Sequence, residues 1–147
     1  GLGLRQDLRE RLFEAMPGVR SGLHRHEWAK HGTCYGRGGR DGYFEDSLAL
    51  LDQINGSSVQ KLFARSVGRR INARAVRDAI NRDFGPAAAQ RVELKCRRDG
   101  RRQLITELRF YLQRSVSVTP RLERLASRGR KARRGCGGGI VDPVGLQ

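Results

Sequence analysis

Apolar residues recur every three or four positions over the first third of the chain, which is the spacing of amphipathic helices. The pattern predicts one helix over residues 4–16, which Pro17-Gly18 ends, and another over 43–55, which Gly56 ends. Residues 35–42 are rich in glycine and arginine and are expected to form a loop.

Two shorter helices are expected next, because each follows a side chain that commonly caps a helix N-terminus. Ser57 or Ser58 would cap the first of them. Asn72 would cap a helix over 73–84, which Gly85-Pro86 breaks. The side of this helix that is predicted to be buried carries Ala75, Val76, Ala79 and Ile80.

The apolar pattern changes to alternation after these helices, which predicts β-strands. Residues 92–96 and 104–112 are expected to form two strands of a hairpin, joined by a polar turn over 97–100. The glycine-rich stretch 135–139 is not expected to form a regular element, and residues 140–141 are expected to form a short edge strand.

The length and charge of the chain limit its organisation and its partners. Its 147 residues are expected to form a single domain over 1–147, and no apolar run approaches the length of a membrane span. A net charge of +15 suits a polyanionic partner. All but four of the 30 basic residues are arginine, however, a skew that a GC-rich genome also produces, so both explanations stay open. The basic segment 114–134 is expected to be a loop that contacts RNA, or a tail.

All three histidines, the only tryptophan and one of the three cysteines lie within residues 24–34. This stretch is expected to form a helix, with Ser21 as N-cap and Gly32 at its C-terminal end. Four side chains that transfer protons or bind anions then share one face, within an arc of about 140°. They are His26, Glu27, Lys30 and His31. Because Glu27 and His31 are four residues apart, the carboxylate can orient the imidazole.

This group of side chains suits phosphoryl transfer in which the 2′-hydroxyl of RNA is the nucleophile. An imidazole exchanges a proton near neutral pH, and a lysine with a second histidine stabilises a negatively charged transition state. A zinc site is one alternative, and its ligands would be His24, His26, His31 and Cys34. The five-residue step from His26 to His31 differs from the four-residue step of H-E-x-x-H zinc peptidases. The other alternative, a solvated charged helix face, explains the crowding less well.

Residues 26–34 read H-E-W-A-K-H-G-T-C, which resembles the second active-site segment of the ribonuclease T(2) family at every fixed position. The resemblance implies an endoribonuclease that needs no metal and no cofactor. It would cleave single-stranded RNA, with little base preference, through a 2′,3′-cyclic phosphate. It further implies that His31 is the general base on the 2′-hydroxyl. Glu27 and Lys30 would stabilise the pentacovalent phosphorane, and His26 would bind the phosphate.

The family also has an upstream segment of the form H-G-L-W-P, whose histidine is the partner acid. This sequence has no such segment, and His24 does not match it. We therefore expect either that an N-terminal part is missing or that catalysis is impaired, and that residues 1–147 alone are inactive. The alternative function is a catalytically impaired, basic RNA-binding protein of the same fold.

The resemblance also implies the cysteine pairing and the fold. Cys96 and Cys136 would pair, which leaves Cys34 over and indicates the periplasm or secretion. The fold class expected is α+β, with helices packed on an antiparallel sheet that lacks N-terminal strands. The protein is expected to be a monomer whose partner is RNA, with neither a membrane nor a metal ion.

Overall fold

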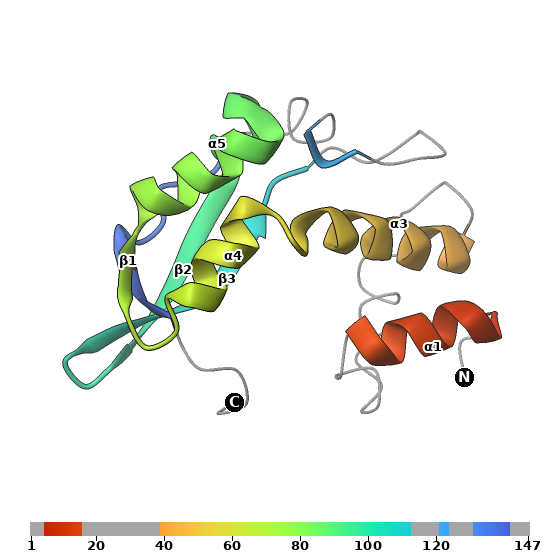
Figure 1. Cartoon of the computed structure of the whole chain (residues 1–147), viewed down its shortest axis with the longest axis horizontal. Helices are drawn as coiled ribbons and strands as arrows, with labels where there is room; N and C mark the ends of the chain where they lie inside the picture. Colours follow the sequence, from red (N-terminus) through yellow and green to blue (C-terminus); the bar gives the residue numbers. More distant parts are fainter. Residues whose placement is uncertain (1–4, 16–38, 113–120, 124–130, 142–147) are drawn as a thin grey trace. The chain divides into compact units, whose positions relative to one another are not determined.

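The structure is a computed structural model that describes residues 5–15, 39–112, 121–123 and 131–141 (Figure 1). The chain divides into two compact units: residues 1–52 with 114–120, and residues 53–113 with 121–147. The described elements, in chain order, are α1 (Gln6–Ala15), α3 (Gly39–Ile54), α4 (Ser58–Arg65), β1 (Arg70–Asn72), α5 (Ala73–Ala89), β2 (Val92–Asp99), β3 (Arg102–Phe110) and β4 (Gly138–Val141). The α+β class is therefore confirmed.

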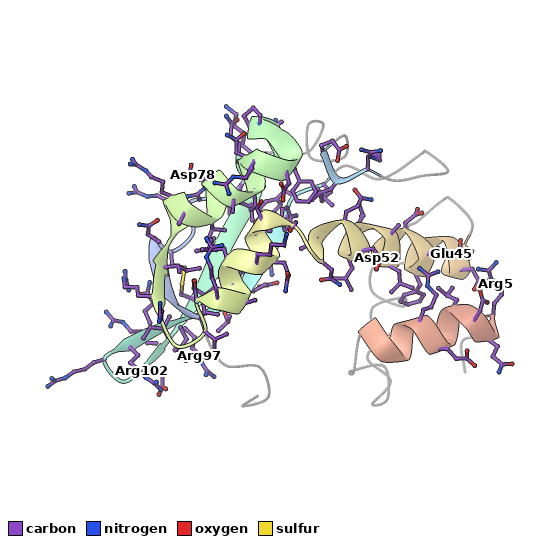
Figure 2. The ribbon with its side chains drawn as sticks, in the orientation of Figure 1. Arg5, Glu45, Asp52, Asp78, Arg97 and Arg102 are labelled. Atoms are coloured by element: carbon purple, nitrogen blue, oxygen red, sulfur yellow. A yellow bond between two sulfur atoms is a disulfide. The ribbon has the colours of Figure 1, made fainter. Side chains whose placement is uncertain are left out.

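The first unit contains the parallel pair α1 and α3, which ion pairs join near both ends. Arg5 pairs with Glu45 and, at 3.5 Å, with Asp41 (Figure 2), while Arg11 lies 3.9 Å from Asp52. Among the described side chains of this pair, the buried hydrophobic ones are Leu8, Phe44 and Leu48, and Asp46 is buried as well. The predicted α1 is confirmed. Helix α3 begins at Gly39, so the loop expected over 35–42 is wrong from that residue onward. Asp41 in the first turn favours this earlier start because its charge opposes the helix dipole.

The second unit is built on a four-stranded sheet of order β1-β4-β3-β2. The hairpin pair β2–β3 is antiparallel, as expected. Strand β1 was not predicted from the sequence; it pairs antiparallel with β4, whereas β3 and β4 run parallel, so the sheet is mixed. A hairpin fixes only the pairing of strands adjacent in sequence, and β4 comes from a segment far along the chain. The sequence pattern therefore did not specify the direction of β4.

Strand β4 lies inside the sheet, which corrects two sequence predictions. Residues 140–141 are not at an edge, and Gly138 and Gly139 belong to a strand although the glycine-rich stretch was expected to be irregular. The absence of a side chain is what admits this segment. A Cβ on Gly139 would lie 2.8 Å from the carbonyl oxygen of Gln103, closer than real Cβ atoms approach. Glycine is therefore selected here by the close approach of β3.

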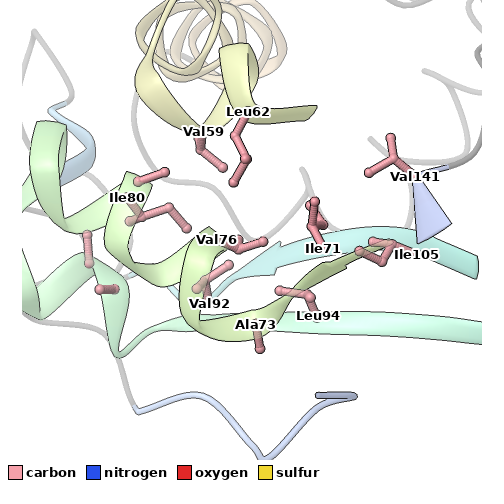
Figure 3. Packing of buried hydrophobic residues seen from close by; sticks show 13 residues of the cluster. Val59, Leu62, Ile71, Ala73, Val76, Ile80, Val92, Leu94, Ile105 and Val141 are labelled. Carbon is pink, nitrogen blue, oxygen red and sulfur yellow. The ribbon is translucent and has the colours of Figure 1, made fainter. Parts of the chain in front are cut away.

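Helices α4 and α5 pack on one face of this sheet and enclose the hydrophobic core (Figure 3). Val59 and Leu62 of α4 meet Val76 of α5 above the strands. The buried residues of the core are Val59, Leu62, Ile71, Ala73, Val76, Ala79, Ile80, Ala88, Ala89, Val92, Leu94, Ile105 and Val141. Three of the four α5 residues predicted to be buried belong to this set, and the fourth, Ala75, packs partly buried against it.

The predicted caps set the starts of these two helices. The Ser57 hydroxyl accepts a hydrogen bond from the Gln60 amide, and the Asn72 side chain accepts one from Ala75 at 2.8 Å. Gly85 interrupts α5 with φ 85° and ψ 169°, as expected, but the helix resumes after it and ends at Ala89. The break at Gly85 therefore kinks α5 without ending it.

A β-bulge in β3 decides which of its side chains face the helices. Lys95 pairs with Glu107 and Cys96 pairs with Ile105, so Thr106 is the extra residue of the bulge, and its hydroxyl donates to the Lys95 carbonyl at 3.2 Å. The extra residue shifts the alternation, and both Ile105 and Leu108 pack toward the core. The hairpin is also longer than predicted, because β2 continues to Asp99.

Candidate functional site

The four predicted catalytic and phosphate-binding side chains, His31, Glu27, Lys30 and His26, lie outside the described residues. The same holds for the zinc alternative, because His24 and Cys34 fall in the same stretch. Their assignments therefore stay predictions. Within the part of the chain that the structure describes, no three His, Cys, Asp or Glu side chains gather closely enough to hold a metal ion.

The structure contains the Cys96–Cys136 disulfide that the resemblance implied, with 6.1 Å between the two Cα atoms. The bond joins the middle of β2 to the segment that leads into β4. Cys136 is also held by its backbone, because its N–H donates to the Leu94 carbonyl at 3.1 Å. The disulfide therefore fixes the approach to the interior strand.

Residues 131–136 are bound along β2. The Ala132 N–H donates to the Gln90 carbonyl at 2.9 Å, one residue beyond the end of α5. Gly135 lies so close to β2 that a Cβ there would overlap the carbonyl oxygen of Leu94. The other described part of the basic segment 114–134 is also anchored: Leu122 is fully buried, and its N–H donates to the Gln53 side chain at 2.9 Å. The described parts of this basic segment thus belong to the folded unit.

A buried carboxylate lies on the sheet face opposite the helices. Glu93 is 6% exposed and accepts a hydrogen bond from the Tyr111 hydroxyl at 3.1 Å. Nearby, the carboxylate of Glu107, 3.3 Å away, raises the pKa of the Arg109 guanidinium. The sequence pattern did not indicate that Glu93 is buried, because strand alternation places a polar residue here on the solvent-facing side. The only signal in the sequence was that Glu93 lies between two apolar residues, both of which are buried in the hydrophobic core.

The second unit also carries a depression of about 520 Å³, formed where residues 131–134 run past α5. We call it the basic groove. Its lining residues are Arg77, Asp78, Asn81, Pro86, Ala89, Gln90, Val92, Lys131, Ala132, Arg133 and Arg134. Four of these are cationic and one is a carboxylate, so the lining is positively charged. Figure 2 shows Asp78 on α5, well away from Arg102 at the tip of the β2–β3 hairpin and from Arg97 farther back on β2.

The cations of the basic groove are available to a ligand. Lys131, Arg133 and Arg134 are exposed, and Arg77 is half-buried. Among the described residues, no carboxylate lies within ion-pair distance of these four. Each cation can therefore bind an external anion without first breaking an internal pair.

Comparison with known proteins places the chain in a family. The model of the ribonuclease T2 family matches residues 3–121, which include the stretch 26–34. The chain belongs to the ribonuclease T2 family. It is also similar to ribonuclease I of Escherichia coli (strain K12), with 31% identity over 120 residues. This alignment covers 80% of the chain but 44% of the relative, so the chain spans less than half the length of that protein.

The comparison bears on the site in two ways. The family match confirms the resemblance drawn from residues 26–34 and extends it over α1, α3, α4, α5 and the β2–β3 hairpin. Three of the four cations of the basic groove, Lys131, Arg133 and Arg134, follow the matched residues. No helix in the described part of the chain is long and apolar enough to cross a membrane.

Proposed function

We propose that the chain is the catalytic part of an endoribonuclease that cleaves single-stranded RNA by transphosphorylation to a 2′,3′-cyclic phosphate. The observation that carries the proposal is the H-E-W-A-K-H-G-T-C stretch at 26–34 within a chain that matches the ribonuclease T2 family. His31 takes the proton of the 2′-hydroxyl. Glu27 and Lys30 stabilise the charge of the phosphorane, and His26 binds the phosphate. Little base preference is proposed, and no metal or cofactor takes part.

The Cys96–Cys136 disulfide supports the proposed compartment. Disulfides persist in oxidising environments, so the enzyme would act in the periplasm or after secretion. We further propose that it acts as a monomer and as a single domain.

Cleavage of RNA in EDTA tests the proposal. A substrate with one ribose in an otherwise deoxy strand should be cut only after that ribose, because the 2′-hydroxyl is the nucleophile. The product should end in a 2′,3′-cyclic phosphate, which mass spectrometry identifies. His31→Ala should lower the rate at least about 10²-fold, the lower end expected for general acid–base catalysis. His24→Ala, the matched control, should have little effect.

The assay should be run on residues 1–147 and on the same chain preceded by an H-G-L-W-P segment taken from a family member. We expect turnover to require the longer chain, because the partner acid of the family lies in its upstream segment. Equal losses in the His31 and His24 variants would refute the assignment of the base. Cleavage that needs a metal ion would refute the mechanism.

A second candidate function is RNA binding without catalysis. The basic groove favours it, because four cations line a surface that needs no contribution from residues 26–34. Binding of RNA by the longer chain without any cleavage would select this function.

A further inference from the structure

The four cations of the basic groove come from two segments that are distant in sequence. Arg77 belongs to α5, whereas Lys131, Arg133 and Arg134 precede Cys136. The side chains of Asn81 and Gln90 supply amide donors to the same surface, and Asp78 supplies the one carboxylate. A surface with several cations, neutral donors and one anion suits a ligand that carries more than one negative charge.

The fold holds this surface in place before any ligand binds. The Ala132 N–H bonds to Gln90 at the end of α5, and the Cys136 N–H bonds to Leu94 in β2. The disulfide then ties the same segment to Cys96. Because the backbone that carries the cations is already ordered, binding costs less conformational entropy than it would for a basic tail.

The size and lining of the groove favour a single polyanionic strand. Its volume of about 520 Å³ falls within the range of about 300–1,000 Å³ typical of small-molecule sites, the scale of nucleotides. The apolar part of its lining is Pro86, Ala89, Val92 and Ala132. The lining thus has no large exposed apolar side chain that would insert into a lipid surface.

We propose that the basic groove binds the phosphate backbone of single-stranded RNA outside the linkage that is cleaved. The groove thereby extends the contact with long substrates and leaves short ones unaffected. This inference rests on the proposed function for the identity of the strand. The binding itself is tested without cleavage.

The test compares two charge-matched triple variants of the full chain. The groove variant carries Lys131→Gln, Arg133→Gln and Arg134→Gln. The control variant carries Arg97→Gln, Arg98→Gln and Arg101→Gln at the hairpin tip, where all three arginines are exposed. Both lose three positive charges from the second unit, so they separate a defined site from net charge. Thermal unfolding of each variant checks that the fold is retained.

The probe is a fluorescent 2′-O-methyl oligonucleotide of about 20 nucleotides, which cannot be cleaved because its 2′-oxygens are blocked. In the groove variant Kd should rise at least about 10-fold at low salt. The slope of log K against log salt should fall by about 2, since each lost contact to a single strand removes about 0.7. The control variant should change Kd by less than about 3-fold. A third variant, Arg133→Lys with Arg134→Lys, should keep the slope because it keeps the charges.

Three outcomes would overturn the inference. Equal losses in the groove and control variants would show that only net charge matters. An unchanged slope in the groove variant would show that its cations do not touch the strand. Groove-dependent binding to phosphatidylglycerol vesicles that is tighter than binding to the oligonucleotide would make the surface a lipid site.

Kinetics on the chain preceded by the H-G-L-W-P segment separate this inference from the proposed function. The groove variant should lower kcat/KM on long RNA by the same factor as Kd, through KM, and should cleave a dinucleotide at the parent rate. Binding that depends on the groove without any cleavage would retain this inference and reject the enzyme. If the groove variant cleaves long RNA at the parent rate, the enzyme is retained and this inference is rejected.

Discussion

The Cys96–Cys136 disulfide closes a loop that contains β3 and the segment of the basic groove, and its removal should cost much of the stability of the second unit. The perturbation is the double substitution Cys96→Ala with Cys136→Ala. Both cysteines pack partly buried against the core. The truncated side chains therefore lose contacts in addition to the crosslink.

The magnitude follows from the length of the loop. The two cysteines are 40 residues apart, and in the chain-entropy model a loop of that length stabilises the folded state by about 4 kcal/mol. With an m-value of about 2 kcal/mol/M in urea, this loss shifts the unfolding midpoint by about 2 M.

Urea unfolding of the oxidised parent, the reduced parent and the double variant measures the effect. The reduced parent should unfold well below the oxidised parent, and the double variant should unfold somewhat below the reduced parent, because it also loses the core contacts of the two side chains. Hydrogen exchange should show the loss at the amides of β2 and β4, which the crosslinked segment joins. Cys34→Ala alone removes a thiol without opening this loop and is the matched control.

Two results would refute this reasoning. A change in unfolding free energy below about 1 kcal/mol would show that the crosslink does not constrain the unfolded chain. A dominant non-reduced peptide that contains Cys34 joined to Cys96 or to Cys136 would show that the pairing itself is wrong.

Three further substitutions test contacts that the structure shows. Asn72→Ala should cost about 1 kcal/mol of unfolding free energy because it removes the cap of α5, and Asn72→Asp should not; equal losses would contradict the capping role. Gly139→Ala should cost about 1–3 kcal/mol because the new Cβ meets the Gln103 carbonyl oxygen, whereas Gly137→Ala, with open space around it, should cost far less. The backbone N–H of the first residue of α4 donates to Asp83 and lowers the pKa of that carboxyl. Asp83→Asn should therefore lower the thermal midpoint at pH 7. The difference from the parent should begin to shrink as the pH falls below about 4, where the unfolded chain binds a proton first, and should vanish below the lowered pKa of the folded state, where the carboxyl is protonated in both states. A difference that grows toward low pH would contradict this assignment.

The sequence by itself determined the parts of this protein that depend on neighbouring residues. The cap at Asn72, a cap at either Ser57 or Ser58, the break at Gly85 and the β2–β3 hairpin could be predicted from the sequence, because each arises from contacts within a few positions. The stretch 26–34 was readable for a related reason. Its residue types at fixed spacing matched a family pattern, and the family match over residues 3–121 agrees with it.

Only the tertiary structure decided where distant segments meet. The alternation of apolar and polar residues along β3 could not show that Thr106 forms a bulge and so changes which side chains face the core. A bulge depends on how the strand pairs with its partner strand. The alternation also could not show that Gly139 admits β4 between β1 and β3. The charge of residues 131–134 was visible in the sequence, but the groove was not, because Arg77 joins them only after α5 has packed on the sheet. Local sequence patterns specify the helices and strands. How these pack together into a surface depends on segments of backbone that are distant in sequence and approach each other closely.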